Sequence, residues 1–287
     1  MAAPSIHRPF VGSSKPPIGV RVLNPEVPAP VSAILLQEAG GATVADALRP
    51  GVQGVMMGAA WTGSPGGGGI RTAAGQYAVF NQVPSTYSFA GDQTVVVRVY
   101  WDGSGAGTSR RIVTRSGGLA GYAEWLLCLN SSNRWEWSVT DTSLNARRAS
   151  SGDAVGAGWH VLVGRIRVNG GLDLFVDGLR SSGDVWAGTR KTDGSRLYLG
   201  RFDDTYSEPF SGVIECVMLW DQALGDGMIL SLCSEPYRVF WGPRRRGRSG
   251  PIVAYGTSLI GIMPTVAADG SRISAYGDEC QSSGGSS

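Results

Sequence analysis

Short runs of alternating apolar and polar residues, separated by turn signals, recur through most of this chain and limit its fold more than any other feature. In the run VVVRVYW, residues 95–101, the odd-numbered side chains share one face of a strand. Val96, Arg98 and Tyr100 share the other face. A strand of this kind packs one face on a core and turns the other toward solvent or a ligand, which is typical of antiparallel sheets.

The same alternation predicts strands in many further segments and only one helix. The helix is expected near residues 227–233, where Asp226 is a candidate N-cap and Pro236 ends the helix. Many short strands with one helix predict two sheets packed face to face. The expected strands are residues 54–61, 76–80, 93–101, 111–114, 124–129, 134–140, 159–168, 173–176, 196–200 and 212–220.

The composition predicts one large globular domain with extended ends. With 287 residues, 42% of them hydrophobic and 17% charged, the chain can bury a core and is not typical of a disordered protein. Residues 1–30 are rich in proline, which removes backbone donors, so we expect an extended N-terminal arm there. We expect an all-β, two-sheet antiparallel jelly-roll β-sandwich over residues 31–243. A basic linker and C-terminal arm are expected over residues 244–287.

Charge and targeting features argue against several classes of protein. A formal net charge of +2 does not favour a nucleic-acid partner, because DNA-binding domains gather many more basic residues on one face. The first twenty residues lack the apolar core of a signal peptide, and no run of 18 apolar residues occurs. We therefore expect synthesis in a cytoplasm and no membrane insertion. The arginines of residues 244–248 are interpreted as a linker, with contact to DNA or an acidic neighbour as the alternative.

The four cysteines do not form a disulfide scaffold or match a zinc-binding spacing. Cys128 and Cys216 lie in strand-like runs, Cys233 lies in the expected helix, and Cys280 lies in the tail. We interpret them as small buried side chains.

Residues 158–180, GWHVLVGRIRVNGGLDLFVDGLR, carry a recognisable set of motifs. They resemble laminin G-like domains of the concanavalin A-like lectin/glucanase superfamily, in which a Trp-x-His-like strand start leads to a Leu-Tyr-Val-Asp-Gly hairpin. Three further motifs of these domains follow in order, at residues 197–200, 210–215 and 219–224. Residues 177–178 favour a type I′ turn, and Trp159 and Phe175 are expected in the core.

The flanking segments narrow the resemblance. Residues 23–25, 35–46 and 234–240 are similar to the opening and closing motifs of tailed-bacteriophage and prophage virion proteins that carry this domain. Gln37 stands where those proteins usually have Asn, and Glu215 with Cys216 stands where Asp-Glu is common. The resemblance covers residues 20–245.

The resemblance includes glucanases, so carboxylate pairs were compared with their E-x-D-x-x-E pattern, and no such string occurs. The nearest imitation is Asp173 with Asp177, which four strand residues separate by about 13 Å. Glycoside hydrolysis needs roughly 5 to 9.5 Å between its two carboxyl groups. Only His7 and His160 could serve as the base for a nucleophile. We expect no enzymatic activity.

Calcium is the candidate cofactor that the resemblance implies, because many laminin G-like domains hold one ion at the sandwich rim. Asp203, Asp204 and Glu208 form the richest group of hard oxygen ligands. The alternative is that they are solvated loop acids. No other cofactor is expected.

Exposed tryptophans are the candidate ligand-binding residues, because sugar rings stack on indole rings. The chain has nine tryptophans. The alternative for the chosen residues is that they fill the core. The chosen residues are Trp125, Trp135, Trp137 and Trp186.

Together these features predict a noncatalytic bacteriophage virion structural protein, either a capsid decoration or a tail or fibre appendage. Its lectin-like sandwich is displayed on the particle exterior, where host-surface glycans are candidate ligands. The terminal arms bind other virion proteins, the major capsid or tail subunits, and the chain forms a homo-oligomer located in the virion. The alternative is a free carbohydrate-binding module, and a polysaccharide hydrolase ranks third.

Overall fold

The computed structural model describes residues 15–16, 23–81, 87, 89–105, 107–116, 122–186, 188–192, 196–205 and 208–240. The predicted basic linker and C-terminal arm, together with Cys280, lie outside these residues, as does most of the predicted N-terminal arm. Among the described residues, no helix is long and apolar enough to cross a membrane.

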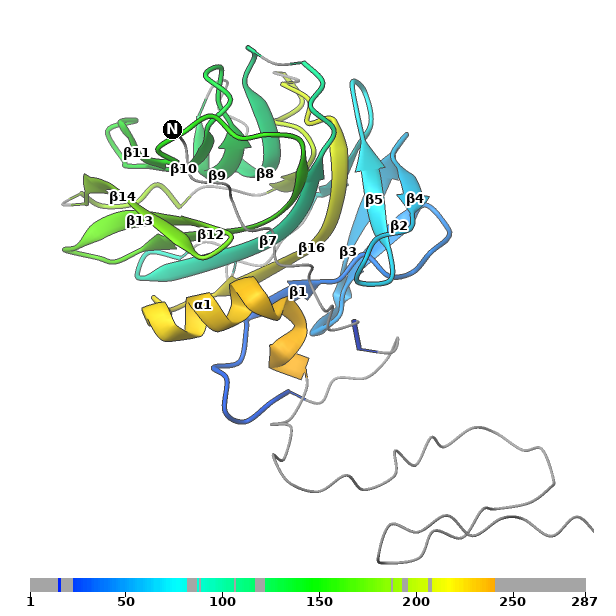
Figure 1. Ribbon diagram of the computed structural model, residues 1–287, viewed down its shortest axis with the longest axis horizontal. Coiled ribbons are helices and arrows are strands. Elements are labelled where there is room, and N and C mark those ends of the chain that lie inside the picture. The colour runs from blue at the N-terminus through cyan, green and yellow to red at the C-terminus, as the bar shows by residue number, and fades with distance from the viewer. Residues whose placement is uncertain are drawn as a thin grey trace, which may run out of the picture. The chain divides into compact units, whose positions relative to one another are not determined.

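The described chain is all-β and antiparallel, as the alternation predicts, with one α-helix and a short 3-10 helix near its end (Figure 1). Helix α1 is Asp226–Ser234 and the 3-10 helix η2 is Pro236–Phe240. The strands are β1 Ser32–Ile34, β2 Thr43–Asp46, β3 Arg49–Met57, β4 Ala60–Thr62, β5 Gly69–Thr72, β6 Tyr77–Phe80, β7 Gln93–Trp101, β8 Arg110–Ser116, β9 Ala123–Leu129, β10 Trp135–Thr140, β11 Ala146–Ser150, β12 Gly158–Ile166, β13 Gly171–Val176, β14 Leu179–Val185, β15 Arg196–Leu199 and β16 Gly212–Trp220.

The strands do not form two separate sheets, and this corrects the expected two-sheet arrangement. They pair in one continuous order, β11-β10-β9-β8-β15-β6-β3-β2-β1-β16-β7-β12-β13-β14, with β4 and β5 attached beside β16. Strands β1 to β3 make the connection, because β3 pairs with β6 and β1 pairs with β16. We call β6, β15 and β8 to β11 the groove layer, and β1, β16, β7 and β12 to β14 the helix layer.

The two ends of this strand order lie beside each other, so the sheet nearly closes on itself. The backbone N–H of Arg148 in β11 donates to Asp184 Oδ2 in β14 at 2.9 Å. Gly183 permits the approach, because a Cβ at this position would overlap the carbonyl oxygen of Arg148. Figure 1 shows β11 beside β14.

One core fills the space between the two layers. Inward-pointing side chains of β7, among them Val97 and Val99, meet those of β9 and β10, including Trp125 and Trp137, and all are fully buried. Gly164 in β12 gives Trp137 its space, since a Cβ there would overlap the indole ring. The alternation predicted for residues 95–101 and 134–140 is confirmed.

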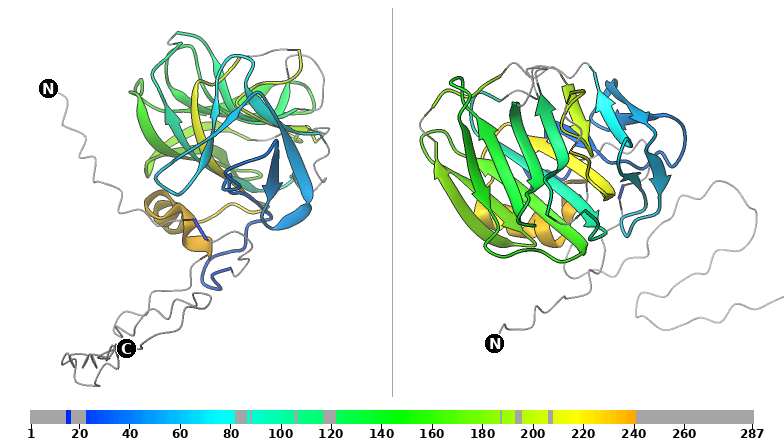
Figure 2. Two further views of the ribbon diagram at one scale, coloured as in Figure 1. Left: turned by 90° about the vertical axis from the view of Figure 1, so that its right-hand side faces the viewer. Right: turned by 90° about the horizontal axis from the view of Figure 1, so that it is seen from above.

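A second buried cluster covers the outer face of the helix layer. Met218 and Trp220 of β16 pack there with Ile229 and Leu232 of α1. Figures 1 and 2 show α1, drawn in orange, on this side and away from β8 to β11. The outer face of the helix layer is therefore largely closed to solvent at this end.

Residues 23–30 contribute to the cover, which differs from the extended arm expected there. The backbone N–H of Asn24 donates to the carbonyl of Val239 at 2.7 Å. Trp220 donates its indole N–H to the carbonyl of Pro28 at 2.8 Å, and Val27 is buried in the second cluster. Proline does not prevent this packing, because the segment's polar contacts use carbonyls and the N–H groups that remain.

Further along the same outer face lies a buried ion pair between Arg98 and Glu215, with their side chains 2.6 Å apart and at most 2% exposed. Tyr237 donates its hydroxyl to Glu215 Oε1 at 2.5 Å, and the N–H of Gly66 donates to Oε2 at 3.3 Å. Burial raises the pKa of Tyr237 well above its usual value, so the phenol remains a donor.

Two local predictions are confirmed. Asp177 and Gly178 have φ of 52° and 90°, the positive values that a type I′ turn requires. The three described cysteines, Cys128, Cys216 and Cys233, are free and buried. The helix lies where it was expected, but its N-cap is Gly225 and not Asp226, which occupies the first turn.

Candidate functional site

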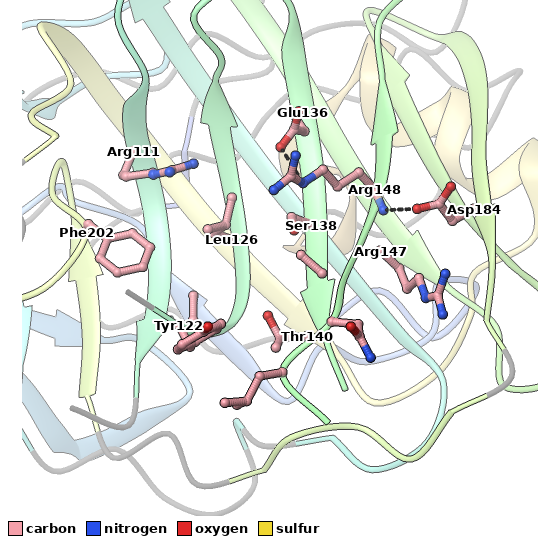
Figure 3. A pocket seen from close by; sticks show the side chains of 14 residues that line it. Arg111, Tyr122, Leu126, Glu136, Ser138, Thr140, Arg147, Arg148, Asp184 and Phe202 are labelled. Atoms are coloured by element: carbon pink, nitrogen blue, oxygen red, sulfur yellow. Dashed lines mark hydrogen bonds and ion pairs between the residues drawn. The ribbon is translucent and has the colours of Figure 1, made fainter. Parts of the chain in front are cut away.

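A groove of about 630 Å³ lies on the outer face of strands β8 to β11 (Figure 3). Leu126, Ser138 and Thr140 form its floor, because they alternate with the side chains that point into the core. Arg111 and Phe202 lie together at one side of it. The other lining residues are Tyr122, Ala123, Glu136, Leu144, Asn145, Ala146, Arg147, Arg148 and Asp184.

The floor of the groove carries two hydroxyl groups, those of Ser138 and Thr140. Among the described residues, neither hydroxyl has a protein hydrogen-bond partner. A hydroxyl offers one donor and two acceptor positions. The floor can therefore pair with a ligand that is itself rich in hydroxyl groups.

Arginines stand on both sides of the groove. Arg111 pairs with Glu208 at 2.5 Å, and Arg148 lies 3.5 Å from Glu136. Arg147 is exposed, and within the described part of the chain it has no ion-pair partner. Because each guanidinium has five N–H donors, the paired arginines also keep donors for a ligand.

The two carboxylates of the groove are engaged by protein donors. Glu136 Oε2 accepts from the amide of Asn130 at 3.2 Å and from the hydroxyl of Ser150 at 3.3 Å. Its other oxygen faces Arg148, and Asp184 accepts the backbone N–H of the same arginine. These contacts, drawn in part in Figure 3, tie both carboxylates to protein donors.

Tyr122 supplies the accessible aromatic ring of the groove. It is 39% exposed at the rim. Phe202 is buried, and the guanidinium of Arg111 lies 5.2 Å from its ring centre. An amphipathic ring beside polar groups is the arrangement with which proteins hold sugar rings.

The predicted ligand-binding tryptophans lie in the core, which corrects their assignment. Their inward position follows from strand alternation, since Trp135 and Trp137 alternate with Glu136 and Ser138. Burial removes their ring faces from any ligand, so the alternative, core packing, holds. The four residues, all at most 2% exposed, are Trp125, Trp135, Trp137 and Trp186.

The predicted calcium ligands do not converge on one point. Asp204 pairs with Arg196, and Glu208 pairs with Arg111. Asp203 is buried and accepts the N–H of Thr205 at 2.8 Å. Among the described residues, no group of three or more His, Cys, Asp and Glu side chains is placed to hold a metal ion.

Asp173 and Asp177, the sequence's nearest match to a catalytic carboxylate pair, also make structural contacts. Asp173 is 1% exposed and accepts from Arg165, Arg167 and Arg180 at 2.7 to 3.0 Å. Asp177 lies in the type I′ turn and contacts His160 at 2.8 Å. Both carboxylates therefore hold strands together.

Sequence reasoning missed the groove residues, although a signal was present. In β10 the polar residues Glu136 and Ser138 alternate with the buried tryptophans, so one face of this strand is polar. The same reasoning placed Trp159 in the core, whereas the structure leaves it half-buried. Polar residues on the outer face of a strand mark an uncovered surface, and that surface is where a ligand can bind.

Three comparisons place the chain among known proteins. The model of the concanavalin A-like lectin/glucanases superfamily matches residues 72–229. No curated protein sequence matches the chain. Solved structures match in fold at low identity.

A Trypanosoma rangeli sialidase in complex with the inhibitor DANA is 17% identical, with a TM-score of 0.56 over 74% of this chain and 34% of the sialidase. The same sialidase in complex with sialic acid gives 17% identity and a TM-score of 0.55, over 75% of this chain and 36% of that one. The binding domain of Paraclostridial Mosquitocidal Protein 1 is 12% identical, with a TM-score of 0.55 over 71% of this chain and 51% of that one. The chain thus spans a third to a half of these proteins, and the likeness is one of fold.

These comparisons correct the predicted function. A bacteriophage virion structural protein was expected, and the similar structures are instead a sialidase and a toxin binding domain, so that prediction is wrong. The predicted superfamily agrees with the matching family model. The predicted partners, oligomeric state and location stay predictions.

Proposed function

Because the chain belongs to the concanavalin A-like lectin/glucanases superfamily, we propose that it is a noncatalytic carbohydrate-binding domain whose ligand lies in the groove over β8 to β11. This was the alternative that the sequence left open. The similar structures include a sialidase in complex with sialic acid, which supports a glycan as the class of ligand.

The observation that carries the proposal is the composition of the groove. The unpaired hydroxyls of Ser138 and Thr140 line the same groove as the exposed ring of Tyr122 and the side chain of Arg147. A sugar presents an apolar C–H face and several hydroxyls, so the ring and the polar floor match its two kinds of surface. The groove volume of about 630 Å³ lies within the usual range for small-molecule sites.

The engaged carboxylates support a noncatalytic role. Most glycoside hydrolases use one carboxyl group as acid and a second as base or nucleophile. In the groove, Glu136 and Asp184 already accept bonds from protein donors. Binding requires none of this chemistry and uses only the donors and the ring that remain free.

The test is a glycan microarray with the full chain, followed by calorimetric titration of the strongest glycan. Tyr122→Ala is expected to weaken binding about tenfold, which corresponds to about 1.4 kcal/mol. Tyr77→Ala is the matched control, because Tyr77 is a half-buried tyrosine of β6 that does not line the groove. It is expected to bind as the unmodified chain does.

Three results would contradict the proposal. They are the absence of binding to any glycan on the array, equal binding by the two tyrosine variants, and the release of a free sugar from the bound glycan. The last result would make the protein an enzyme.

A further inference from the structure

A second cavity, of about 440 Å³, lies on the outer face of the helix layer. Trp159 of β12 and Arg98 of β7 line it, together with Pro65, His160 and the glycine-rich residues 156–158. Trp159 and Arg98 lie on the side of these strands opposite the shared core. The groove lies on the outer face of the other layer, so the two cavities open on opposite sides of the core.

Trp159 has the features of a stacking platform. It is half-buried, whereas Trp125, Trp135 and Trp137 are fully buried. Its ring packs on Tyr100, the residue across from it on β7, with ring centres 5.5 Å apart, and the guanidinium of Arg98 lies 5.4 Å from its ring centre. These contacts fix the indole in place before any ligand arrives, which lowers the entropy lost on binding.

The indole N–H of Trp159 is open as a donor. Within the described part of the chain the indole nitrogen has no hydrogen-bond partner, and it is not fully buried. By contrast, Trp61, which is also half-buried, donates its N–H to the carbonyl of Gly41 at 2.8 Å.

The carbonyl of Gly156 brings an acceptor to the cavity. His160, which also lines the cavity, has Nδ1 2.8 Å from Asp177 Oδ2 and Nε2 3.3 Å from the carbonyl oxygen of Gly156. The other oxygen of Asp177 accepts the N–H of Val161. A carbonyl oxygen has two lone pairs, so that of Gly156 can also accept from a hydroxyl of a ligand.

We propose that the Trp159 cavity is a second carbohydrate-binding site, which holds one hexose ring with its C–H face on the indole, while hydroxyls of the glycan pair with the indole N–H and with the carbonyl of Gly156. An aromatic side chain of a partner protein would also stack on Trp159, but it would leave the polar groups unpaired, and unpaired polar groups weaken binding. The ligand class rests on the proposed function, and the site does not overlap the groove.

Two sites on opposite sides of one core make the domain bivalent. One chain then links two glycan strands, and the combined binding to a dense glycan surface exceeds that of either site alone. A carbohydrate-binding domain with the groove alone does not have this property.

The experiment follows each tryptophan separately by ¹⁹F NMR of the full chain labelled with 5-fluorotryptophan. The signal of Trp159 is assigned by its loss in Trp159→Phe, or in Trp159→Tyr if the first variant does not fold. Trp61→Phe assigns the control signal in the same way. The probes are glucose, galactose, N-acetylglucosamine and sialic acid, with N-acetyltyrosine amide as a peptide-like competitor.

At least one sugar is expected to shift the Trp159 signal along a saturable curve while the Trp61 signal stays in place. The shift is expected to persist in Tyr122→Ala, because that residue lines only the groove. A silent Trp159 signal, in a chain whose groove still binds a glycan, overturns the second site and leaves the proposed function intact. A shift with N-acetyltyrosine amide but with no sugar also overturns it. Silence at both sites overturns the proposed function as well.

Discussion

The outer faces of the two layers differ although their strands follow the same alternation. On the groove layer the outward residues of β10 are Glu136, Ser138 and Thr140, and a polar groove lies over them. On the helix layer the outward residues of β16 include Met218 and Trp220, and helix α1 packs over them. Alternation alone shows which side chains of a strand point into the core and which point outward. Whether the outward side chains are apolar or polar indicates whether another element covers the outer face of the sheet.

The ion pairs of the two faces show the same difference. Arg98 and Glu215, on the covered face, are at most 2% exposed, whereas Arg148 on the open face is 60% exposed beside Glu136. A buried charge that loses its partner is costly, but an exposed one regains water.

The largest effect is expected from the same substitution on the two faces. Glu215→Gln removes the buried carboxylate that offsets the charge of Arg98, so the free energy of unfolding should fall by about 3 to 5 kcal/mol. Glu136→Gln, the matched change on the open face, should cost about 0 to 1 kcal/mol. Urea unfolding followed by tryptophan fluorescence measures both.

A double variant identifies the cause. Adding Arg98→Met to Glu215→Gln also removes the buried positive charge and should restore part of the stability. If the double variant were as unstable as the single one, or if the two faces lost equal stability, the difference in cover would not explain the energies.

The shared core gives the next effect. Gly164→Ala places a Cβ in the ring of Trp137, which is fully buried and has no room to move, so we expect a loss of about 1 to 3 kcal/mol. Gly152→Ala is the control, because nothing lies within 4 Å of a Cβ at that position. Thermal unfolding of the two variants compares them, and equal melting temperatures would contradict the close contact between the layers.

Lys15 gives the covered face a pH dependence. Its Nζ donates to the carbonyl of Gly68 at 2.5 Å, and burial lowers its pKa from 10.5 to about 8. Between these two pH values the unfolded chain binds more protons, so the contribution of this lysine to the free energy of unfolding rises with pH, by at most about 1.4 kcal/mol per pH unit.

The measurement compares Lys15→Met with the unmodified chain. Methionine keeps the apolar stem and removes the titrating group. From about pH 7 to about pH 9.5, the free energy of unfolding of the unmodified chain should therefore rise relative to that of Lys15→Met. The open face has its own control in Arg147→Met, whose difference should stay constant, since arginine keeps its charge over this range. A constant difference for Lys15→Met would contradict the lowered pKa.

The smallest effect concerns the thiols. Burial raises the pKa of Cys128, below the groove, and of Cys233, in the helix, to about 12, and it also raises that of Cys216. In a Cys280→Ser background these thiols should not react with Ellman's reagent at about pH 8, because only the thiolate reacts. Unfolding in guanidinium should release all three. Rapid reaction of a native thiol would show that its face of the protein opens.

The sequence predicted the strands with strong apolar alternation and missed those without it. Residues 93–101 and 212–220 were expected as strands and form β7 and β16 with the same bounds. Strands β11 and β14, ARRAS and LRSSGDV, were not expected, because most of their side chains are exposed and polar. Pairing with a neighbouring strand holds such segments, and no local pattern records it.

The candidate site likewise depends on strand pairing that no local sequence pattern records. The groove uses Tyr122 from just before β9, Ser138 from β10 and Arg147 from β11, so it exists only when three strands lie side by side in register. The sequence contained its polar residues, but it did not contain their adjacency. It did contain the tryptophans, and their alternation with polar residues already pointed to the core.

Local sequence was sufficient for the all-β class, for the inward and outward faces of β7 and β10, for the type I′ turn and for the buried state of the described cysteines. These follow from local sterics and from the period of two along a strand. The tertiary structure alone decided that β1 to β3 join the layers into one continuous sheet, that α1 covers one outer face, and that the other face stays open as a groove. Each of these depends on contacts between residues far apart in the chain, and their free energy is gained only when the distant segments meet.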